Sequence, residues 1–333
     1  MFVRPSVLRK RGIVGMNCRN LRYIHTYNDR SLYPAVDDKL KTRLLAEKAG
    51  IPSARVLGVV RRPHQVRTVR DRLPEKGFVL KPAKGSGGKG ILVVRETGER
   101  GYLRSNGHWL AYPDLQRHVH NTLAGLFSLA GTPDVVMIEE LVRSDDVFAD
   151  YSVEGVPDIR IIVFKGYPVM AMLRLATHAS DGKANLHQGA VGVGIDIGTG
   201  GAVGGVQFDR AIDTHPDSGR PLHALAIPGW TDILELAARC HEMSGLGYLG
   251  ADIVLDRTRG PLLLELNARP GLTIQVANRQ GLEPRLAHVE QDAPTDLTPV
   301  QRVAHAQRVF GRAPHLSTES EADASHRTVV ATS

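Results

Sequence analysis

Residues 262–267 constrain the fold more than any other segment of the chain. Their leucines alternate with Glu265 and Asn267, and such alternation is typical of a β-strand with one buried face. Glu265 and Asn267 then project together from the opposite face. A strand is also expected at 251–255, and a loop at 257–260 would place Asp252 opposite Glu265. Three oxygen ligands suited to Mg²⁺ would then converge, although an ordinary half-exposed hairpin shows the same pattern.

Apolar periodicity and turn residues divide most of the chain into helices and strands. Strands arranged in hairpins, with helices between them, indicate an α+β fold. The first 33 or so residues are basic and weakly patterned, and the polar composition beyond about residue 294 predicts a frayed or disordered tail. The expected helices are 37–50, 114–130 and 231–243, the expected strands are 54–60, 78–80, 91–94 and 135–142, and the expected hairpins are 159–175, 189–206 and 251–267.

Composition excludes several classes of protein. With 42% hydrophobic residues over 333 positions, the chain can form two or three compact subdomains. Its two cysteines, Cys18 and Cys240, provide neither a disulfide framework nor a tetrahedral zinc site, which favours the cytoplasm. No apolar run reaches the length of a membrane span, and none follows the basic N-terminus as in a signal peptide. The net charge of +7 is spread along the chain and only 5% of residues are aromatic, so neither nucleic acid nor membrane is expected as a partner.

A glycine-rich segment follows the expected strand at 78–80. Lys81 ends that strand, and a lysine is costly to bury there unless it meets an anion. The sequence Lys-Gly-Ser-Gly-Gly-Lys-Gly comes next at 84–90, and its backbone N–H groups can surround a phosphate. The segment lacks the Gly-Lys-Ser/Thr ending of a Walker A loop, and a strand follows it instead of the helix of a Rossmann motif. Taken alone, it fits a phosphate loop or a simple turn.

Taken in order, these segments resemble the ATP-grasp superfamily over residues 37–281. The helix at 37–50, the strand at 78–80 with its glycine loop, and the segment 137–142 are similar to the opening helix, the phosphate-gripping lid and the adenine hinge of such domains. A narrower similarity is to the RimK-type branch, the α-L-glutamate ligase-like proteins. It is carried by Asp158-Ile-Arg160, Arg174, Asn185-Leu-His187 and Glu265-Leu-Asn267.

The resemblance implies an ATP-grasp fold, in which two α+β lobes enclose Mg–ATP. It divides the chain into a short basic N-terminal segment at 1–35, a reduced form of the domain that precedes ATP-grasp domains in the family, then an ATP-grasp domain at 36–290 and a polar tail at 291–333. Within the domain, about 55–140 would form the lid lobe and about 141–290 the C-terminal lobe. The segment 143–157 departs from the family pattern as an insertion. It is either an acceptor-binding loop or, as we favour, solvated filler.

The same resemblance implies roles for individual residues. ATP is expected with two Mg²⁺ ions, or with Mn²⁺ in their place. The phosphates are expected to contact Lys39, Lys81, Gly85, Ser86, Gly87, Gly88 and Asn185, and the adenosine to contact Glu139, Glu140, Leu141 and Val142. The catalytic residues are expected to be Arg160, Arg174 and Asn185, and the metal ligands to be Asp252, Glu265 and Asn267.

The implied activity is that of a cytoplasmic, ATP-dependent carboxylate–amine ligase. Such an enzyme forms an acyl phosphate, releases ADP and phosphate, and joins an amino acid such as glutamate to an amino acid, peptide or protein. The alternatives are a different acceptor (a sugar-linked amine or a thiol) and a nucleotide-binding regulatory protein without turnover. A homo-oligomer is a family expectation.

The segment around Asn185, which is expected to face the substrate, has two further features. Where the family has an arginine two residues before Asn185, this chain has Lys183, a point charge instead of a bidentate donor. His178 and His187 flank the same segment, and histidines at such places are more often structural than proton-transferring.

Overall fold

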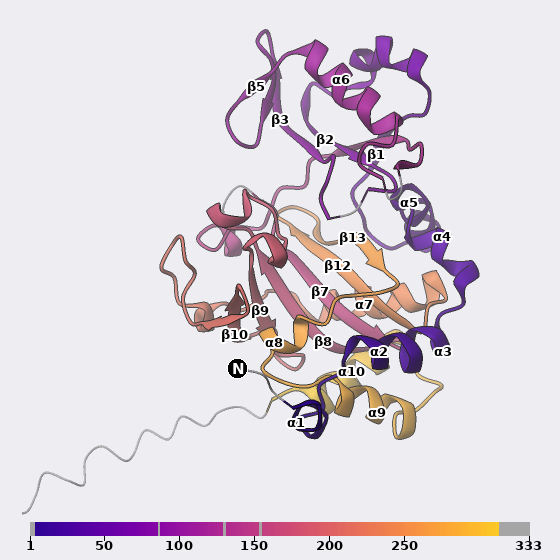
Figure 1. Ribbon diagram of the computed structural model, residues 1–333, viewed down its shortest axis with the longest axis vertical. Helices are drawn as coiled ribbons and strands as arrows, with labels where there is room; N and C mark the ends of the chain where they lie inside the picture. The colour runs from indigo at the N-terminus through magenta and orange to yellow at the C-terminus, as the bar shows by residue number, and fades with distance from the viewer. Residues whose placement is uncertain (1–3, 86, 129–130, 153–154, 313–333) are drawn as a thin grey trace, which may run out of the picture.

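The computed structural model describes residues 4–85, 87–128, 131–152 and 155–312. Two antiparallel sheets form its framework, one above the other in Figure 1. The smaller sheet has the strand order β1-β6-β2-β3-β4-β5, and the larger has the order β11-β10-β9-β8-β7-β12-β13. This combination of antiparallel sheets with helices confirms the expected α+β class.

The smaller, six-stranded sheet forms the upper lobe with helix α6 (Tyr112–Leu123) and the 3₁₀ helix η3 (Pro63–Arg72). Phe78, Leu80 and Ile138 from the sheet pack with Leu115 and Val119 of α6 in its core. The expected helix at 114–130 is therefore present but ends at Leu123, two residues before Gly125, which adopts a φ of 87°. The strands are β1 (Val56–Val60), β2 (Lys76–Pro82), β3 (Leu92–Gly98), β4 (Gly101–Arg104), β5 (Trp109–Leu110) and β6 (Val136–Glu140).

The seven-stranded sheet forms the lower lobe. Its central strands β7 and β8 are buried along almost their whole length, which is why both are nearly continuous apolar runs in the sequence. They are joined by Lys165 and Gly166, whose φ angles of 49° and 81° form the two-residue hairpin turn expected there. The strands are β7 (Asp158–Phe164), β8 (Tyr167–Leu175), β9 (Val191–Ile195), β10 (Ala202–Gln207), β11 (Arg210–Ile212), β12 (Tyr248–Asp256) and β13 (Gly260–Asn267).

Helices surround this larger sheet and share its core. The expected helix at 231–243 is α7, and the expected helix at 37–50 is α5, which Asp38 caps by accepting bonds from the backbone N–H groups of Leu40 and Lys41. The α-helices of this lobe are α5 (Lys39–Lys48), α7 (Trp230–Ser244), α8 (Ile274–Ala277), α9 (Glu283–Gln291) and α10 (Pro299–Phe310). Short 3₁₀ turns are η5 (Asp146–Phe148), η6 (His178–Ser180), η7 (Leu186–Gln188) and η8 (Leu222–Ala224).

The N-terminal segment packs against the larger sheet as a chain of short helices. Tyr23 lies edge-on to Phe164 and stacks on Tyr248, and Asn28 exchanges hydrogen bonds with the backbone of Tyr248. The described part of this segment therefore shares the core of the lower lobe. Its helices are α1 (Pro5–Lys10), α2 (Met16–Cys18), the π-helix η1 (Arg19–Ile24), α3 (His25–Tyr27), the 3₁₀ helix η2 (Arg30–Leu32) and α4 (Tyr33–Val36).

The expectation of a frayed tail beyond residue 294 is wrong for the described residues up to 312. Thr298 caps α10 and Pro299 begins it, and Gln301 completes a capping box. Val303, Ala306 and Phe310 are buried against the lower lobe. Their helical spacing was overlooked because the segment was judged by its overall polar composition. That composition combines the buried and the exposed faces of the helix. Residues 313–333 lie outside the described residues.

The insertion at 143–157 is attached to the end of β12. The backbone N–H of Arg143 donates to the Asp256 carboxylate and that of Asp145 to the carbonyl of Leu255. Phe148 is buried in the main core. The described part of the insertion is thus packed against the lobe, which solvated filler would not be. Among the described residues, no helix is long and apolar enough to cross a membrane.

A buried ion cluster joins the two lobes at the hinge. Glu139 on β6 is fully buried, and its carboxylate accepts from Lys81 Nζ at 2.6 Å and from Arg43 Nε at 2.8 Å. Arg43 belongs to α5, and its Nη1 also donates to the carbonyl of Leu263 on β13 at 2.9 Å. Burial alone would raise the pKa of Glu139, but Lys81 and Arg43 lower it to about 2. One arginine therefore bonds to both sheets.

Truncating Val303 tests whether α10 is part of the fold. Val303 is 1% exposed, whereas Val300 on the same helix is 56% exposed. We expect Val303→Ala to lower the free energy of unfolding by roughly 1.5–3 kcal/mol, and Val300→Ala by less than about 0.5 kcal/mol, both measured by urea denaturation. Equal, small effects of the two substitutions would show that α10 does not pack as described.

The hinge cluster predicts a specific dependence of stability on pH. The pKa of Glu139 falls on folding from its ordinary value of 4.5 to about 2, so the paired carboxylate stabilises the fold above about pH 4.5 and loses this contribution as the pH falls toward 2. We expect Glu139→Gln to lower the free energy of unfolding at pH 7 by roughly 3–5 kcal/mol and to flatten its decline between pH 5 and 3. Glu96→Gln, on an exposed position of β3, is the control. An unchanged acid limb in Glu139→Gln would contradict the assignment.

Candidate active site

Four strands of the larger sheet bring charged side chains together on one face. Asp252 on β12 lies opposite Glu265 on β13 and opposite Arg160 on β7, and Asp158 on β7 lies opposite Arg174 on β8. Directly opposed residues share a face of the sheet. The expected placement of Asp252 opposite Glu265 is therefore confirmed. The expected loop at 257–260 is one residue too long, because Asp256 already pairs with Gly260, and a β-bulge at Leu264 restores the register.

Asp252 is at the centre of this charged cluster. It is fully buried, and its carboxylate accepts from Arg160 Nε at 2.7 Å, from Arg160 Nη2 at 2.5 Å and from Arg174 Nη2 at 2.7 Å. Arg174 Nε also donates to Asp158 at 2.6 Å. Burial would raise the pKa of Asp252, but the two arginines hold it below its usual range. Burial also raises the pKa of Asp158, and Arg174 is the one cation bonded to it among the described residues.

The expected metal ligands are brought within hydrogen-bond reach of one another. Asn267 Nδ2 lies 3.3 Å from Asp252 Oδ2 and 3.5 Å from Glu265 Oε1. Glu265 is more open than Asp252, with 32% of its side chain exposed against 0%. Two carboxylates and an amide oxygen are the donor types that Mg²⁺ accepts, together with water and phosphate oxygens. The donor set therefore fits the cation, although both oxygens of Asp252 are paired with arginines in this arrangement.

Lys39 connects Glu265 on β13 to the glycine loop. Its Nζ donates to the carbonyl of Gly85 at 2.6 Å and lies 3.6 Å from Glu265 Oε2. Gly87 and Gly88 adopt φ angles of 62° and 74°, and a side chain at either would meet no atom within 4 Å. This part of the loop is therefore open, and Ser86 lies outside the described residues.

The residues expected to hold adenosine fall into two groups. The carboxylates of Glu139 and Glu140 are both paired, that of Glu139 in the hinge cluster and that of Glu140 with Arg55 and Arg259. Leu141 and Val142, which continue from β6, are half-buried. In this structure Lys81 Nζ donates to the Glu139 carboxylate. The expected contacts of Glu139 with adenosine and of Lys81 with phosphate stay predictions. For Glu140, Leu141 and Val142 the expectation stays a prediction.

Asn185 lies outside the charged cluster. It caps the turn η7, and its Oδ1 accepts from the backbone N–H of His187 at 3.1 Å. In the described structure it makes no hydrogen bond to Arg160 or Arg174, so its catalytic role stays a prediction. Nearby, Lys183 pairs with Asp181, and His178 with Asp217.

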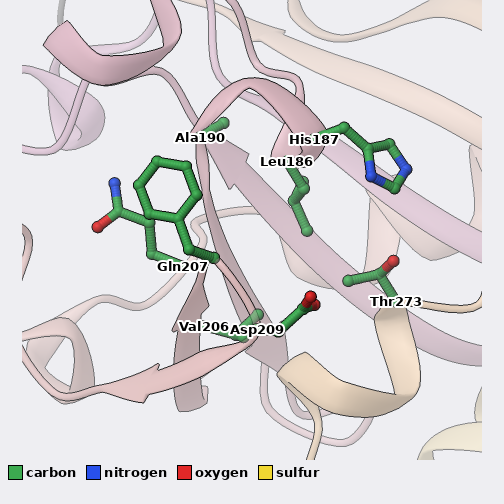
Figure 2. Close-up of a pocket in the computed structure, with 8 residues that line it drawn as sticks. Leu186, His187, Ala190, Val206, Gln207, Asp209 and Thr273 are labelled. Carbon is green, nitrogen blue, oxygen red and sulfur yellow. The ribbon is translucent and has the colours of Figure 1, made fainter.

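His187 lines a cavity of about 150 Å³ beside the cluster. Figure 2 shows that Leu186 and His187 reach it from η7, Thr273 from the start of α8, and Gln207 and Asp209 from the hairpin of β10 and β11. The complete lining is Leu186, His187, Ala190, Val206, Gln207, Phe208, Asp209 and Thr273.

Two charged residues of this region received no role from the sequence: Arg43 was not singled out, and Asp158 was named only as part of a motif. Arg43 lies three positions from Leu40 and from Ala46, which are both buried, so the three share one face of α5. A charged residue on this apolar face was a signal that could have been used. Asp158 lies two positions before Arg160 in a strand, which places both on one face. Neither signal identifies the partner, because the partners lie on other elements.

Several solved structures of ligases are similar to this chain at low sequence identity. A search of curated proteins found no match. Among solved structures, the ATP-grasp ligase PsnB complexed with a minimal precursor matches with a TM-score of 0.42 and 16% identity, covering 80% of this chain and 64% of PsnB. The D-cycloserine synthetase DcsG matches with a TM-score of 0.44 and 18% identity, covering 83% of this chain and 72% of DcsG. The L-amino acid ligase from Bacillus licheniformis matches with a TM-score of 0.40 and 14% identity, covering 74% and 43%. The chain thus spans less than two thirds of PsnB and of the Bacillus ligase.

A family match covers most of the chain. The family described as sugar-transfer associated ATP-grasp matches residues 18–291. These residues include the whole upper lobe and the seven-stranded sheet with its charged cluster. The chain therefore belongs to the sugar-transfer associated ATP-grasp family and has the ATP-grasp fold.

Proposed function

We propose that this protein is an Mg–ATP-dependent ligase that activates a carboxylate as an acyl phosphate and joins it to an amine. The observation that carries the proposal is the composition of the charged cluster. Lys39, Arg160 and Arg174 face Asp158, Asp252 and Glu265, and Lys39 also bonds to the glycine loop of the lid. Cations held in fixed positions beside oxygen ligands are what phosphoryl transfer requires, because that reaction is catalysed mainly by positioning and charge neutralisation.

Each cation has a distinct task under this proposal. Arg160 and Arg174 are held by buried carboxylates, so their guanidinium groups are oriented before substrate arrives. Lys39 positions the nucleotide phosphates between the glycine loop and Glu265. Asp252, Glu265 and Asn267 would hold Mg²⁺, which supplies charge neutralisation for the phosphate oxygens.

The identity of the two substrates is the finer part of the proposal. The similarity of the motifs to RimK-type ligases supports an amino acid such as glutamate as the carboxylate donor. The description of the matched family as sugar-transfer associated supports a second candidate for the acceptor, a sugar-linked amine. The two candidate acceptors are an amino acid, peptide or protein, as in RimK-type ligases, and a sugar-linked amine. Both would react after the same activation step, and they differ in the amine that attacks the acyl phosphate.

The first experiment measures release of ADP and phosphate from Mg–ATP by the full chain, with a panel of amino acids, short peptides and sugar-linked amines. We expect substrate-dependent release that falls at least about 100-fold in Glu265→Ala. Glu47→Ala, on the exposed face of α5, is the matched control and should turn over normally. ATP binding without turnover on any substrate would favour the alternative of a nucleotide-binding regulatory protein. Absence of ATP binding would rule out both the ligase and this regulatory protein.

A second experiment replaces Arg174 by lysine. Lysine keeps the charge but cannot bond to Asp158 and Asp252 at the same time in the fork geometry of arginine. We expect kcat to fall by roughly 10²–10³-fold while the Kd for ATP changes by less than about threefold, measured by single-turnover kinetics and nucleotide titration. Arg100→Lys, at an exposed position between β3 and β4, is the control. An unchanged kcat in Arg174→Lys would remove this residue from the proposed machinery.

A further inference from the structure

We propose that the cavity between η7 and the β10–β11 hairpin binds the sugar ring of a sugar-linked amine acceptor. This inference rests on the proposed function and names the acceptor class for that activity. It is carried by three observations: the position of the cavity on the sheet, the chemistry of its lining, and the backbone conformation of the two residues at its rim.

The cavity lies on the same face of the sheet as the charged cluster. Asp158, Arg174, Gly192 and Val206 are successive cross-strand partners on β7, β8, β9 and β10, so their side-chain directions share one face. Val206 forms part of the cavity wall, which places it two strand spacings, about 10 Å, from Arg174. Gly192 between them has no side chain, and Leu186 lies over it. The side chains of Leu186 and Met172 fill the space over Gly192, so a ligand in the cavity would bring an amine on a short linker toward Arg174 by displacing Leu186.

The lining suits a molecule with an apolar face and an edge of hydroxyl groups. Leu186, Ala190 and Val206 provide apolar surface, and a cavity of about 150 Å³ takes one six-membered ring. The side-chain polar atoms of His187, Asp209 and Thr273 make no hydrogen bond or ion pair within the described residues, so all three are available to a ligand. Together they include hydrogen-bond donors and acceptors. This combination matches a pyranose ring better than it matches an alkyl chain.

Charge also distinguishes the acceptor from an acidic amino acid. Asp209 is the single carboxylate among the lining residues, and neither lysine nor arginine is among them. A free carboxylate in the cavity would be repelled by Asp209 without a compensating cation. A neutral sugar ring meets no such penalty.

The rim residues Phe208 and Asp209 adopt a backbone conformation that their sequence disfavours. They form the two-residue turn between β10 and β11, with φ angles of 47° and 59°. Such a turn favours Asn-Gly, because positive φ at both positions is costly for other residues. Gln207 Nε2 bonds to the carbonyl of Gly189 at 2.7 Å, and a Cβ on Gly189 would lie 2.8 Å from Phe208 Cζ. The hairpin is thus fastened to the end of η7, and the disfavoured residues are the ones that provide an aromatic ring and the carboxylate to the cavity.

Calorimetric titration of the full chain with three probes tests the ligand class. The probes are 2-aminoethyl glucopyranoside, 2-(cyclohexyloxy)ethylamine, which has the same linker and ring size without hydroxyls, and 1,4-diaminobutane. We expect the glucoside to bind at least about tenfold more tightly than either of the others, because a site built to bond hydroxyls discriminates against analogues that lack them. Equal or tighter binding of the cyclohexyl probe or of the diamine would overturn the proposal.

A turn exchange tests the rim residues. We expect Phe208→Asn with Asp209→Gly to raise Tm by roughly 2–4 °C, because it relieves the disfavoured φ angles, and to weaken binding of the glucoside at least tenfold. Asp209→Asn keeps a hydrogen-bonding side chain and should weaken it by less than about fivefold. Lys165→Asn relaxes the equivalent turn between β7 and β8, away from the cavity, and should leave glucoside affinity unchanged. Wild-type affinity in the double variant would overturn the proposal.

The binding assay uses no ATP, so the two proposals fail separately. Release of ADP with an amino acid acceptor, combined with no binding of the glucoside, would overturn the sugar-ring assignment and leave the ligase assignment in place. Glucoside binding that the turn exchange abolishes, combined with no turnover of ATP on any acceptor, would support the cavity assignment and contradict the ligase.

Discussion

The carboxylate of Glu139 is tolerated in the interior because two cations reach it from different elements. An unpaired carboxylate buried at this point would cost several kcal/mol. Lys81 comes from the neighbouring strand of the same sheet, whereas Arg43 comes from α5 and also bonds to β13 of the other sheet. The need to neutralise the buried Glu139 carboxylate therefore fixes how β6, α5 and β13 are joined between the two lobes. Leu40, Ala83 and Met137 form a small apolar cluster between the cores of the two lobes.

A similar balance of charge governs the face of the larger sheet. Three carboxylates and three cations neutralise one another around Asp252, with bonds as short as 2.5 Å. Under the proposed function, a nucleotide polyphosphate arriving alone would compete with these carboxylates for the same three cations. Asp252, Glu265 and Asn267 would hold a divalent cation bound with it, and that charge would neutralise the carboxylates no longer paired with the arginines and lysine. The arrangement thus favours exchange of partners on binding, and it gives a physical reason for Glu265, the most exposed of the three carboxylates, to be the first to change partner.

Much of the fold could be predicted because its local signals agree with its tertiary structure. The strand at 262–267 carries Glu265 opposite Asp252 as expected, although a β-bulge at Leu264 interrupts the alternation. The Lys-Gly pair at 165–166 forms the turn it indicates. The helix α10 was missed because composition was averaged over a segment whose apolar residues lie on one side. The partners of Glu139 could not be predicted, because a sequence gives the face of a strand but not the helix that will cover it. The residue that bonds to both lobes, Arg43, is for this reason invisible to motif comparison. The cavity was likewise beyond prediction, since its lining comes from η7, β10, the turn after it and the residue before α8.

Two hairpin turns of the same kind show where local preference gives way to the site. Both join adjacent antiparallel strands through two residues with positive φ. The turn at 165–166 contains a glycine and lies away from the cavity. The turn at 208–209 contains Phe208 and Asp209, and an Asn-Gly pair there would relax the backbone while removing both side chains from the rim. Residues with an unfavourable backbone conformation persist in a fold when their side chains are needed for another reason. Phe208 and Asp209 are exposed residues that line the cavity, so core packing gives no reason for this departure from the turn rule, whereas the proposed ligand does.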